Sequence, residues 1–258
     1  MKNSFIVTGL PRSGTSIVAR LLLDNADSLT SELDFFSADA GNPDGYFELR
    51  EIVKINNQIL YWMNPHANFL NPPGGIDLLK AGEKWLHRHF LNEVGILSPD
   101  NDRTGPWSTA GIDTVKSLSY VMDKIQISSF AHHPFLIKDP RFIYTLPFWE
   151  MFLEHLQGDV MKLVIVHRGQ KNVRASHRKL YGIFKGVDVD WNGYKIPACS
   201  WNRYHSLALL AQQQIQAMVP EKNIFQVQYE LLTDEKHQQD LMEFTGSSID
   251  FTKVRGNK

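Results

Sequence analysis

Four short runs of apolar residues, separated by longer stretches with helical periodicity, most constrain the fold of this chain. The runs span residues 5–8, 135–137, 161–166 and 224–227. Two of them, 135–137 and 161–166, are nearly continuous apolar runs, interrupted only by Lys162, which is typical of central strands in a parallel sheet that helices cover on both faces. Helical spacing of apolar residues predicts helices over residues 15–23, 49–62, 76–94, 113–130, 142–156, 170–181, 201–219 and 238–244.

Alternation of strands and helices along the whole chain predicts an α/β fold with a central parallel sheet flanked by helices, wound in both directions. We expect a single domain over residues 1–258, because that length encloses one large core. Residues 183–198 are expected to be irregular. In a sheet of this kind ligands bind beyond the carboxyl ends of the strands, so the residues after each strand are the candidates for function.

The composition excludes several classes of protein. A net charge of −1 argues against a nucleic-acid partner bound over the whole surface, although a local basic cleft stays open. The only cysteine is Cys199, so no intrachain disulfide forms, and without a Cys cluster or an HExxH helix no metal site is expected. His132 and His133 are adjacent and would point to opposite faces of a strand.

The absence of long apolar segments predicts the compartment. No run approaches about 18 apolar residues, so no membrane span is expected. The first strand follows Met1 almost directly, with no apolar leader. If Met1 is the natural start, we expect a cytoplasmic protein.

The turn after the first strand has the spacing of a phosphate-binding loop. Gly9 is followed after four residues by Gly14, Thr15 and Ser16, and Thr15 stands where a P-loop has lysine. Glycines let backbone N–H groups curl around a phosphate at a helix N-terminus, where the helix dipole favours an anion. Arg12 supplies a cation from inside the loop. No strand ends in a Walker-B aspartate, which favours metal-free chemistry on a group less charged than a phosphoryl.

The stretch GLPRSGTS, residues 9–16, resembles the 5′-phosphosulfate loop of the sulfotransferases that use 3′-phosphoadenosine 5′-phosphosulfate (PAPS), in their bacterial, carbohydrate and protein-tyrosine versions. The resemblance implies a P-loop-like sulfotransferase fold with PAPS as the donor, adenosine 3′,5′-bisphosphate as its product, and no metal. It also implies that the donor's phosphosulfate is bound by the loop residues Pro11, Arg12, Ser13, Gly14, Thr15 and Ser16.

A second anion anchor is expected after the strand at residues 161–166. Arg168 follows this strand and Ser176 lies eight residues further on, which matches the 3′-phosphate motif of the same family. Each charge-assisted contact of this kind contributes about 1.5–3 kcal/mol to the binding free energy of the anion. The neighbouring basic residues are interpreted as a solvated helix face: Lys171, Arg174, Arg178 and Lys179.

Two further positions resemble nucleotide contacts of the family. Tyr229, followed by Glu230, ends the last strand, where a tyrosine near the adenine is implied; the alternative is an aromatic residue at the edge of the core. Arg255, followed by Gly256, resembles a basic segment that some members fold over the 3′-phosphate, whereas an ordinary disordered terminus is the alternative.

Acceptor activation needs a base, and stabilisation of the transferred group needs cations. The segment from Glu32 to Phe36 resembles the one that carries the catalytic glutamate, and we expect it to follow a strand next to the first. Glu48 is the reserve base or a structural cap for the helix that follows. Lys138 is either a second cation at the sulfuryl group or part of a stabilising ion network with Asp139 and Arg141.

The expected activity is transfer of a sulfuryl group from PAPS to a hydroxyl or amine of a carbohydrate or small-molecule acceptor, with Glu32, Lys138 and Arg12 as the catalytic residues. Two alternatives stay open. One is a small-molecule kinase of the P-loop class, against which Thr15 argues. The other is a module that binds adenosine bisphosphate without catalysing transfer.

Overall fold

The computed structural model describes residues 4–23, 35–38, 42, 45–63, 136–147, 149, 162–181, 189–191, 194–196 and 201–254. Several predictions lie outside these residues: the helices at 76–94 and 113–130, the pair His132 and His133, and the single residues Glu32, Cys199 and Arg255.

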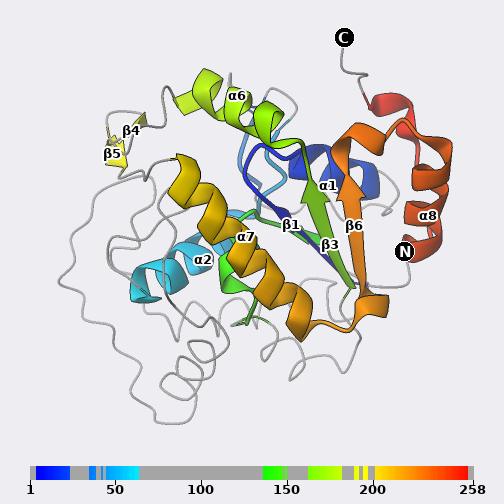
Figure 1. The fold of residues 1–258 in the computed structure, drawn as a ribbon, viewed down its shortest axis with the longest axis horizontal. Helices are drawn as coiled ribbons and strands as arrows, with labels where there is room; N and C mark the ends of the chain where they lie inside the picture. The colour runs from blue at the N-terminus through cyan, green and yellow to red at the C-terminus, as the bar shows by residue number, and fades with distance from the viewer. Residues whose placement is uncertain are drawn as a thin grey trace.

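A four-stranded parallel sheet forms the centre of the molecule (Figure 1). Its strands are β1 (Phe5–Gly9), β2 (Leu136–Lys138), β3 (Lys162–His167) and β6 (Ile224–Gln228), in the order β2-β1-β3-β6. All three pairings are parallel, so the four carboxyl ends meet at one edge. The predicted strands and the α/β class are confirmed.

Both edges of β1 are paired, one with β2 and the other with β3. This corrects the expectation that the strand beside β1 comes directly before Glu32. The residues that follow β2 and β3 therefore lie beside the end of β1, where the phosphate loop begins.

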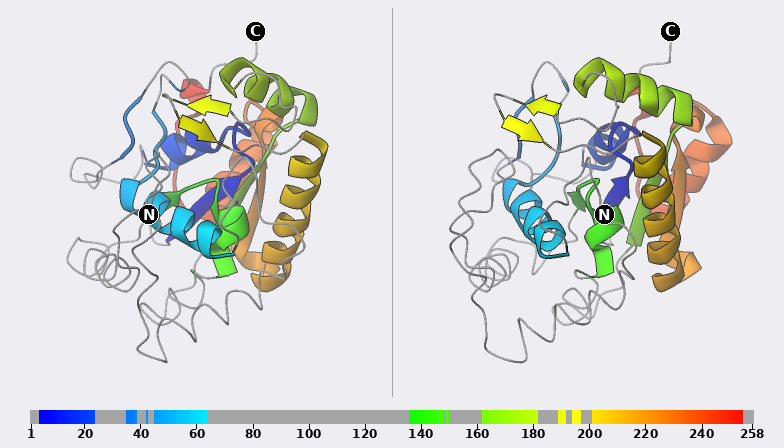
Figure 2. Two further views of the ribbon diagram at one scale, coloured as in Figure 1. Left: turned by 90° about the vertical axis from the view of Figure 1, so that its left-hand side faces the viewer. Right: turned by 60° about the vertical axis from the view of Figure 1, so that its left-hand side comes forward.

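Helices cover both faces of the sheet, as Figures 1 and 2 show. They are α1 (Thr15–Leu23), α2 (Arg50–Met63), α6 (Gln170–Tyr181), α7 (Trp201–Met218) and α8 (Glu235–Thr245). Residues 142–147 are also helical. The five labelled helices agree with predicted helices to within a few residues at their ends, and the end of the helix predicted at 142–156 lies outside the described residues. The described part of the chain contains no helix long and apolar enough to cross a membrane.

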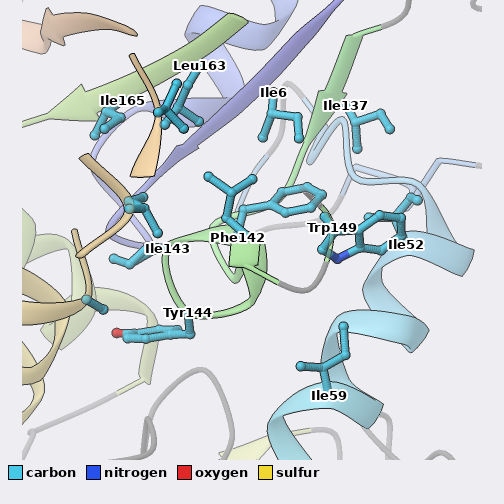
Figure 3. Packing of buried hydrophobic residues seen from close by; sticks show 14 of the residues in the cluster. Ile6, Ile52, Ile59, Ile137, Phe142, Ile143, Tyr144, Trp149, Leu163 and Ile165 are labelled. Atoms are coloured by element: carbon cyan, nitrogen blue, oxygen red, sulfur yellow. The ribbon is translucent and has the colours of Figure 1, made fainter. Parts of the chain in front are cut away.

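Successive strand residues point to opposite faces and create two cores. Ile6 and Ile165 pack with α2, α7 and the segment around Phe142, as Figure 3 shows. Phe5 and Val164 pack on the other face with α1 and α8. The middle residues of β1 and β3 are apolar because both faces of the sheet are buried there.

Residues 183–198, expected to be irregular, include an antiparallel pair. β4 (Val189–Trp191) and β5 (Tyr194–Ile196) face each other, with Asp190 opposite Lys195. The sequence between the two strands is Asn192-Gly193, which is the strongest short signal for a hairpin. The pair adjoins α6 through β4 (Figure 2).

Candidate functional site

The loop between β1 and α1 turns sharply because three of its residues have positive φ. Gly9, Arg12 and Gly14 have φ values of 151°, 70° and 103°. The amide of Ser13 donates to the carbonyl of Leu10 at 2.9 Å and closes the turn. Positive φ is inexpensive for glycine but strained for Arg12, and such strain gathers at ligand sites.

Both glycines of the loop are also required by close packing. A Cβ on Gly9 would lie 2.4 Å from the carbonyl oxygen of Val166 in β3. A Cβ on Gly14 would lie 2.2 Å from the ring of Tyr229. The loop is therefore pressed against the ends of β3 and β6 and is not an isolated turn.

Ser13 is a buried polar residue whose hydroxyl has no hydrogen-bond partner among the described residues. It is 1% exposed, and its Oγ makes no hydrogen bond within the described part of the chain. An unsatisfied buried hydroxyl costs about 1–3 kcal/mol, so its presence inside a glycine loop points to a ligand that would satisfy it.

The two predicted anion anchors contact each other. Nε of Arg12 donates to Oγ of Ser176 at 2.9 Å, although the residues are 164 positions apart. Arg168 donates from its guanidinium to the carbonyl oxygen of Arg12 at 3.3 Å. Both arginines are only partly buried. Two guanidinium groups and one hydroxyl thus lie together at the carboxyl ends of β1 and β3.

Tyr229 joins the same group of residues. It begins the 3₁₀ turn η4 (Tyr229–Leu231), directly after β6. The guanidinium carbon of Arg168 lies 4.5 Å from the centre of its ring, a cation–π distance, and the ring also lies against Gly14. Tyr229 is half-buried, with its ring beside both predicted phosphate motifs.

Helix α6 braces the loop through His177. Nε2 of His177 lies 3.0 Å from the carbonyl oxygen of Pro11, so Nε2 carries the proton and donates. The ring packs against Trp201 and Tyr204 of α7. Burial, only partly opposed by the bond to Pro11, lowers the pKa of His177 from 6.5 to about 4, so the ring is neutral at pH 7.

Glu230 fixes the start of α6 beside Arg168. Its carboxylate accepts from the amide of Gly169 at 2.9 Å and from the side chain of Asn172 at 3.0 Å. Burial would raise the pKa of the Glu230 carboxyl, but these bonds and one from Gln228 lower it. An acidic group at a helix N-terminus is stabilised by the helix dipole.

A buried network of four charges adjoins the loop at the end of β2. Nζ of Lys138 lies 2.5 Å from Oε1 of Glu48, and Arg141 pairs with Oε2 of Glu48 at 3.3 Å and with Asp139 at 2.8 Å. Lys138 also donates to Oγ of Ser16 at 3.3 Å. The ion network expected around Lys138 therefore exists, but the partner of Lys138 is Glu48 and not Asp139.

The charges of this network set opposite pKa shifts on its two acids. Burial would raise the pKa of the Glu48 carboxyl, but Lys138 and Arg141 together lower it below its ordinary value. Burial and the neighbouring Glu48 raise the pKa of Asp139 despite Arg141. A carboxylate with a lowered pKa and a cation on each oxygen is a poor general base, which argues against Glu48 as the reserve base.

The site residues predicted from sequence thus fall into three groups. Those of the loop and of the second anchor lie together: Pro11, Arg12, Ser13, Gly14, Thr15, Ser16, Arg168, Ser176 and Tyr229. Lys138 adjoins them through Ser16. Glu32 and Arg255 lie outside the described residues. Lys171, Arg174 and Arg178 are exposed, as expected of a solvated helix face.

Sequence reasoning missed the supporting roles of His177 and Glu230 and the part that Glu48 plays for Lys138. Only His177 left a signal, since a histidine directly after Ser176 stands next to an anchor on the same helix. No group of three or more His, Cys, Asp or Glu side chains arranged to hold a metal occurs among the described residues.

No protein-family model matches the chain, and no curated protein matches it. Among solved structures, a sulfotransferase domain from the olefin synthase of Synechococcus PCC 7002 is similar to it, with a TM-score of 0.40 and 17% sequence identity. The similarity covers 100% of this chain and 80% of that one. At that TM-score the likeness carries no argument about function.

Proposed function

We propose that this protein is a sulfotransferase that moves a sulfuryl group from PAPS to a hydroxyl or amine of a carbohydrate or small-molecule acceptor. The observation that carries the proposal is the 2.9 Å contact between Arg12 and Ser176, with Arg168 bound to the same loop. One ligand with an anionic group at each end would use both anchors, and PAPS has its phosphosulfate and its 3′-phosphate placed in this way.

The residues present fit such a ligand. The buried Ser13 hydroxyl lacks a partner within the described residues, as does the buried Nε of Arg168, so both stand ready for acceptor oxygens. The ring of Tyr229 lies against the loop and against Arg168, where an adenine could stack. When bound, PAPS would supply the sulfuryl group and a stable leaving group.

The environment of Ser16 favours sulfuryl transfer over a kinase. In a P-loop kinase the hydroxyl at this position binds Mg²⁺. Here Oγ of Ser16 donates to the carbonyl of Tyr46 and accepts from Asn42 and Lys138. The ammonium of Lys138 thus takes a position beside Ser16 where a kinase would hold its metal, and a less charged sulfuryl group needs less neutralisation.

In the proposed reaction the acceptor oxygen or nitrogen forms a bond to sulfur while the bond from sulfur to the bridging oxygen of the 5′-phosphate breaks. Glu32 takes the acceptor proton, and the leaving adenosine 3′,5′-bisphosphate keeps the bridging oxygen with its charge. The loop amides, Arg12 and Lys138 stabilise that charge, and Arg168 with Ser176 positions the nucleotide through its remote phosphate.

Calorimetric titration tests the proposal directly. We expect adenosine 3′,5′-bisphosphate to bind without metal and ATP with Mg²⁺ to bind at least about tenfold more weakly, a difference of about 1.4 kcal/mol. The reverse preference would support the kinase. An assay of Glu32→Gln with phenol and amino-sugar acceptors separates an enzyme from a binding module: transfer should be lost and nucleotide affinity kept.

A further inference from the structure

The carboxylate of Glu48 is held from both sides, in contact with the cations of two different residues. Its Oε1 lies 2.5 Å from Nζ of Lys138 and its Oε2 lies 3.3 Å from Arg141. Arg141 is in turn held by Asp139 and by Asn57, which accepts from its Nε at 2.9 Å. Glu48 cannot rotate away without leaving a buried cation uncompensated, so its position is fixed.

Lys138 uses all three of its ammonium donors, and the three acceptors belong to two different parts of the chain. Two donate to the segment before α2, to Glu48 and to the carbonyl oxygen of Tyr46 at 3.0 Å. The third donates to Oγ of Ser16, in the first turn of α1 directly after the phosphate loop. An ammonium has three donors and no acceptor, so two fixed acceptors behind it direct the remaining N–H toward the loop.

We propose that Glu48 is a positioning residue that holds the ammonium of Lys138 against the phosphate loop, where it would act on the transferred sulfuryl group. This inference rests on the proposed function, since it assigns the task of Glu48 within that site. It replaces a role for Glu48 as a general base, because both carboxylate oxygens already bind cations.

The network offers a matched control for this assignment. Glu48 and Asp139 are both buried carboxylates that bind Arg141, but only Glu48 contacts Lys138. Glu48→Gln and Asp139→Asn therefore each remove one buried acid, whereas only the first releases Lys138. Combining Glu48→Gln with Lys138→Met leaves Arg141 opposite Asp139, so the double variant keeps a balanced pair and should fold.

Turnover is followed as release of adenosine 3′,5′-bisphosphate from PAPS with water as acceptor, which requires no knowledge of the natural acceptor. We expect Glu48→Gln to lower kcat by about 100-fold, as for loss of one electrostatic contact, and to leave KM within about threefold. Asp139→Asn should leave kcat within about fivefold. When Lys138 is already replaced by Met, adding Glu48→Gln should lower kcat by a further factor of less than about three.

Equal losses of kcat in Glu48→Gln and Asp139→Asn would overturn the assignment and leave the proposed function standing. So would an effect of Glu48→Gln that persists undiminished in the Lys138→Met background. If Glu48→Gln does not fold, the double variant compared with Lys138→Met alone still decides the question. A wild-type protein that neither binds adenosine bisphosphate nor releases it from PAPS would overturn both proposals.

Discussion

Arg12 is the residue at which backbone strain and predicted chemistry coincide. Its φ of 70° lies in the left-handed region, which costs a residue with a side chain on the order of 1–3 kcal/mol. Ser176 accepts from its side chain and Arg168 donates to its carbonyl, so the strained conformation is held by both residues of the second anchor. The loop therefore presents its N–H groups in a fixed arrangement before any ligand binds.

Replacing each of the two loop glycines by alanine should affect different properties, folding stability for Gly9 and nucleotide affinity for Gly14. Gly9→Ala meets a backbone carbonyl of β3, which cannot move, so we expect a loss of at least about 2 kcal/mol of folding stability. Gly14→Ala meets the ring of Tyr229, which can turn away, so it should cost less stability and more nucleotide affinity. Thermal melting and calorimetry measure the two effects, and the opposite ranking would contradict the packing.

Arg168 should recognise the 3′-phosphate specifically. Arg168→Ala is expected to weaken PAPS binding by about 10–100-fold, which is the value of one charge-assisted contact. Binding of adenosine 5′-phosphosulfate, which lacks the 3′-phosphate, should weaken by less than about threefold. The control is Arg174→Ala, an exposed cation on the adjoining helix α6, which should change neither affinity. Equal losses for both nucleotides would remove Arg168 from the 3′-phosphate anchor.

At the scale of the element, α6 links the anchor to the loop. Ser176 and His177 are consecutive residues, and one contacts Arg12 while the other contacts the carbonyl of Pro11. Glu230 fixes the first turn of the same helix from the end of β6. Displacement of α6 would therefore disturb both motifs together.

His177 should make folding stability fall in mild acid. Its pKa in the folded protein is about 4 against 6.5 in the unfolded chain, so between these values only the unfolded chain takes up the proton. The loss of folding stability due to His177 is absent above pH 6.5 and reaches about 3 kcal/mol near pH 4. His177→Gln keeps a donor for Pro11 but cannot titrate, so its loss of stability in acid should be smaller by that amount.

Denaturant unfolding at pH 7 and pH 4.5 checks the role of His177. Other groups titrate over the same range in both proteins, so the difference between wild type and His177→Gln isolates the histidine. An identical loss of stability in the two proteins would show that His177 is not buried as a neutral ring against the loop.

Helices and strands could be predicted from the sequence because their periodicity is local. Contacts between side chains that are far apart in the chain could not. Helix α6 and the four strands of the parallel sheet follow from spacing along the chain, whereas Arg168 and Ser176 as a phosphate anchor stay a prediction. The partner of Lys138 is 90 residues away, so no local pattern could identify Glu48, and the adjacent Asp139 was the natural but wrong choice. The hairpin at 189–196 was missed because its strands have three residues each.

At the scale of the whole molecule, the parallel sheet brings the site together. Gly9, Lys138, His167 and Gln228 end the four strands, and the candidate residues follow at the same edge. Segments as far apart as 12 and 176 can therefore contact the same small region. This arrangement would let residues spread over most of the chain contact one nucleotide, as the proposed function requires.

The most direct test of the account is a crystal structure of the protein with adenosine 3′,5′-bisphosphate. We expect the 5′-phosphate in the loop, contacted by Arg12 and Ser13, and the 3′-phosphate between Arg168 and Ser176, with the adenine beside Tyr229. A nucleotide bound elsewhere, or one that contacts only one of the two arginines, would contradict the account.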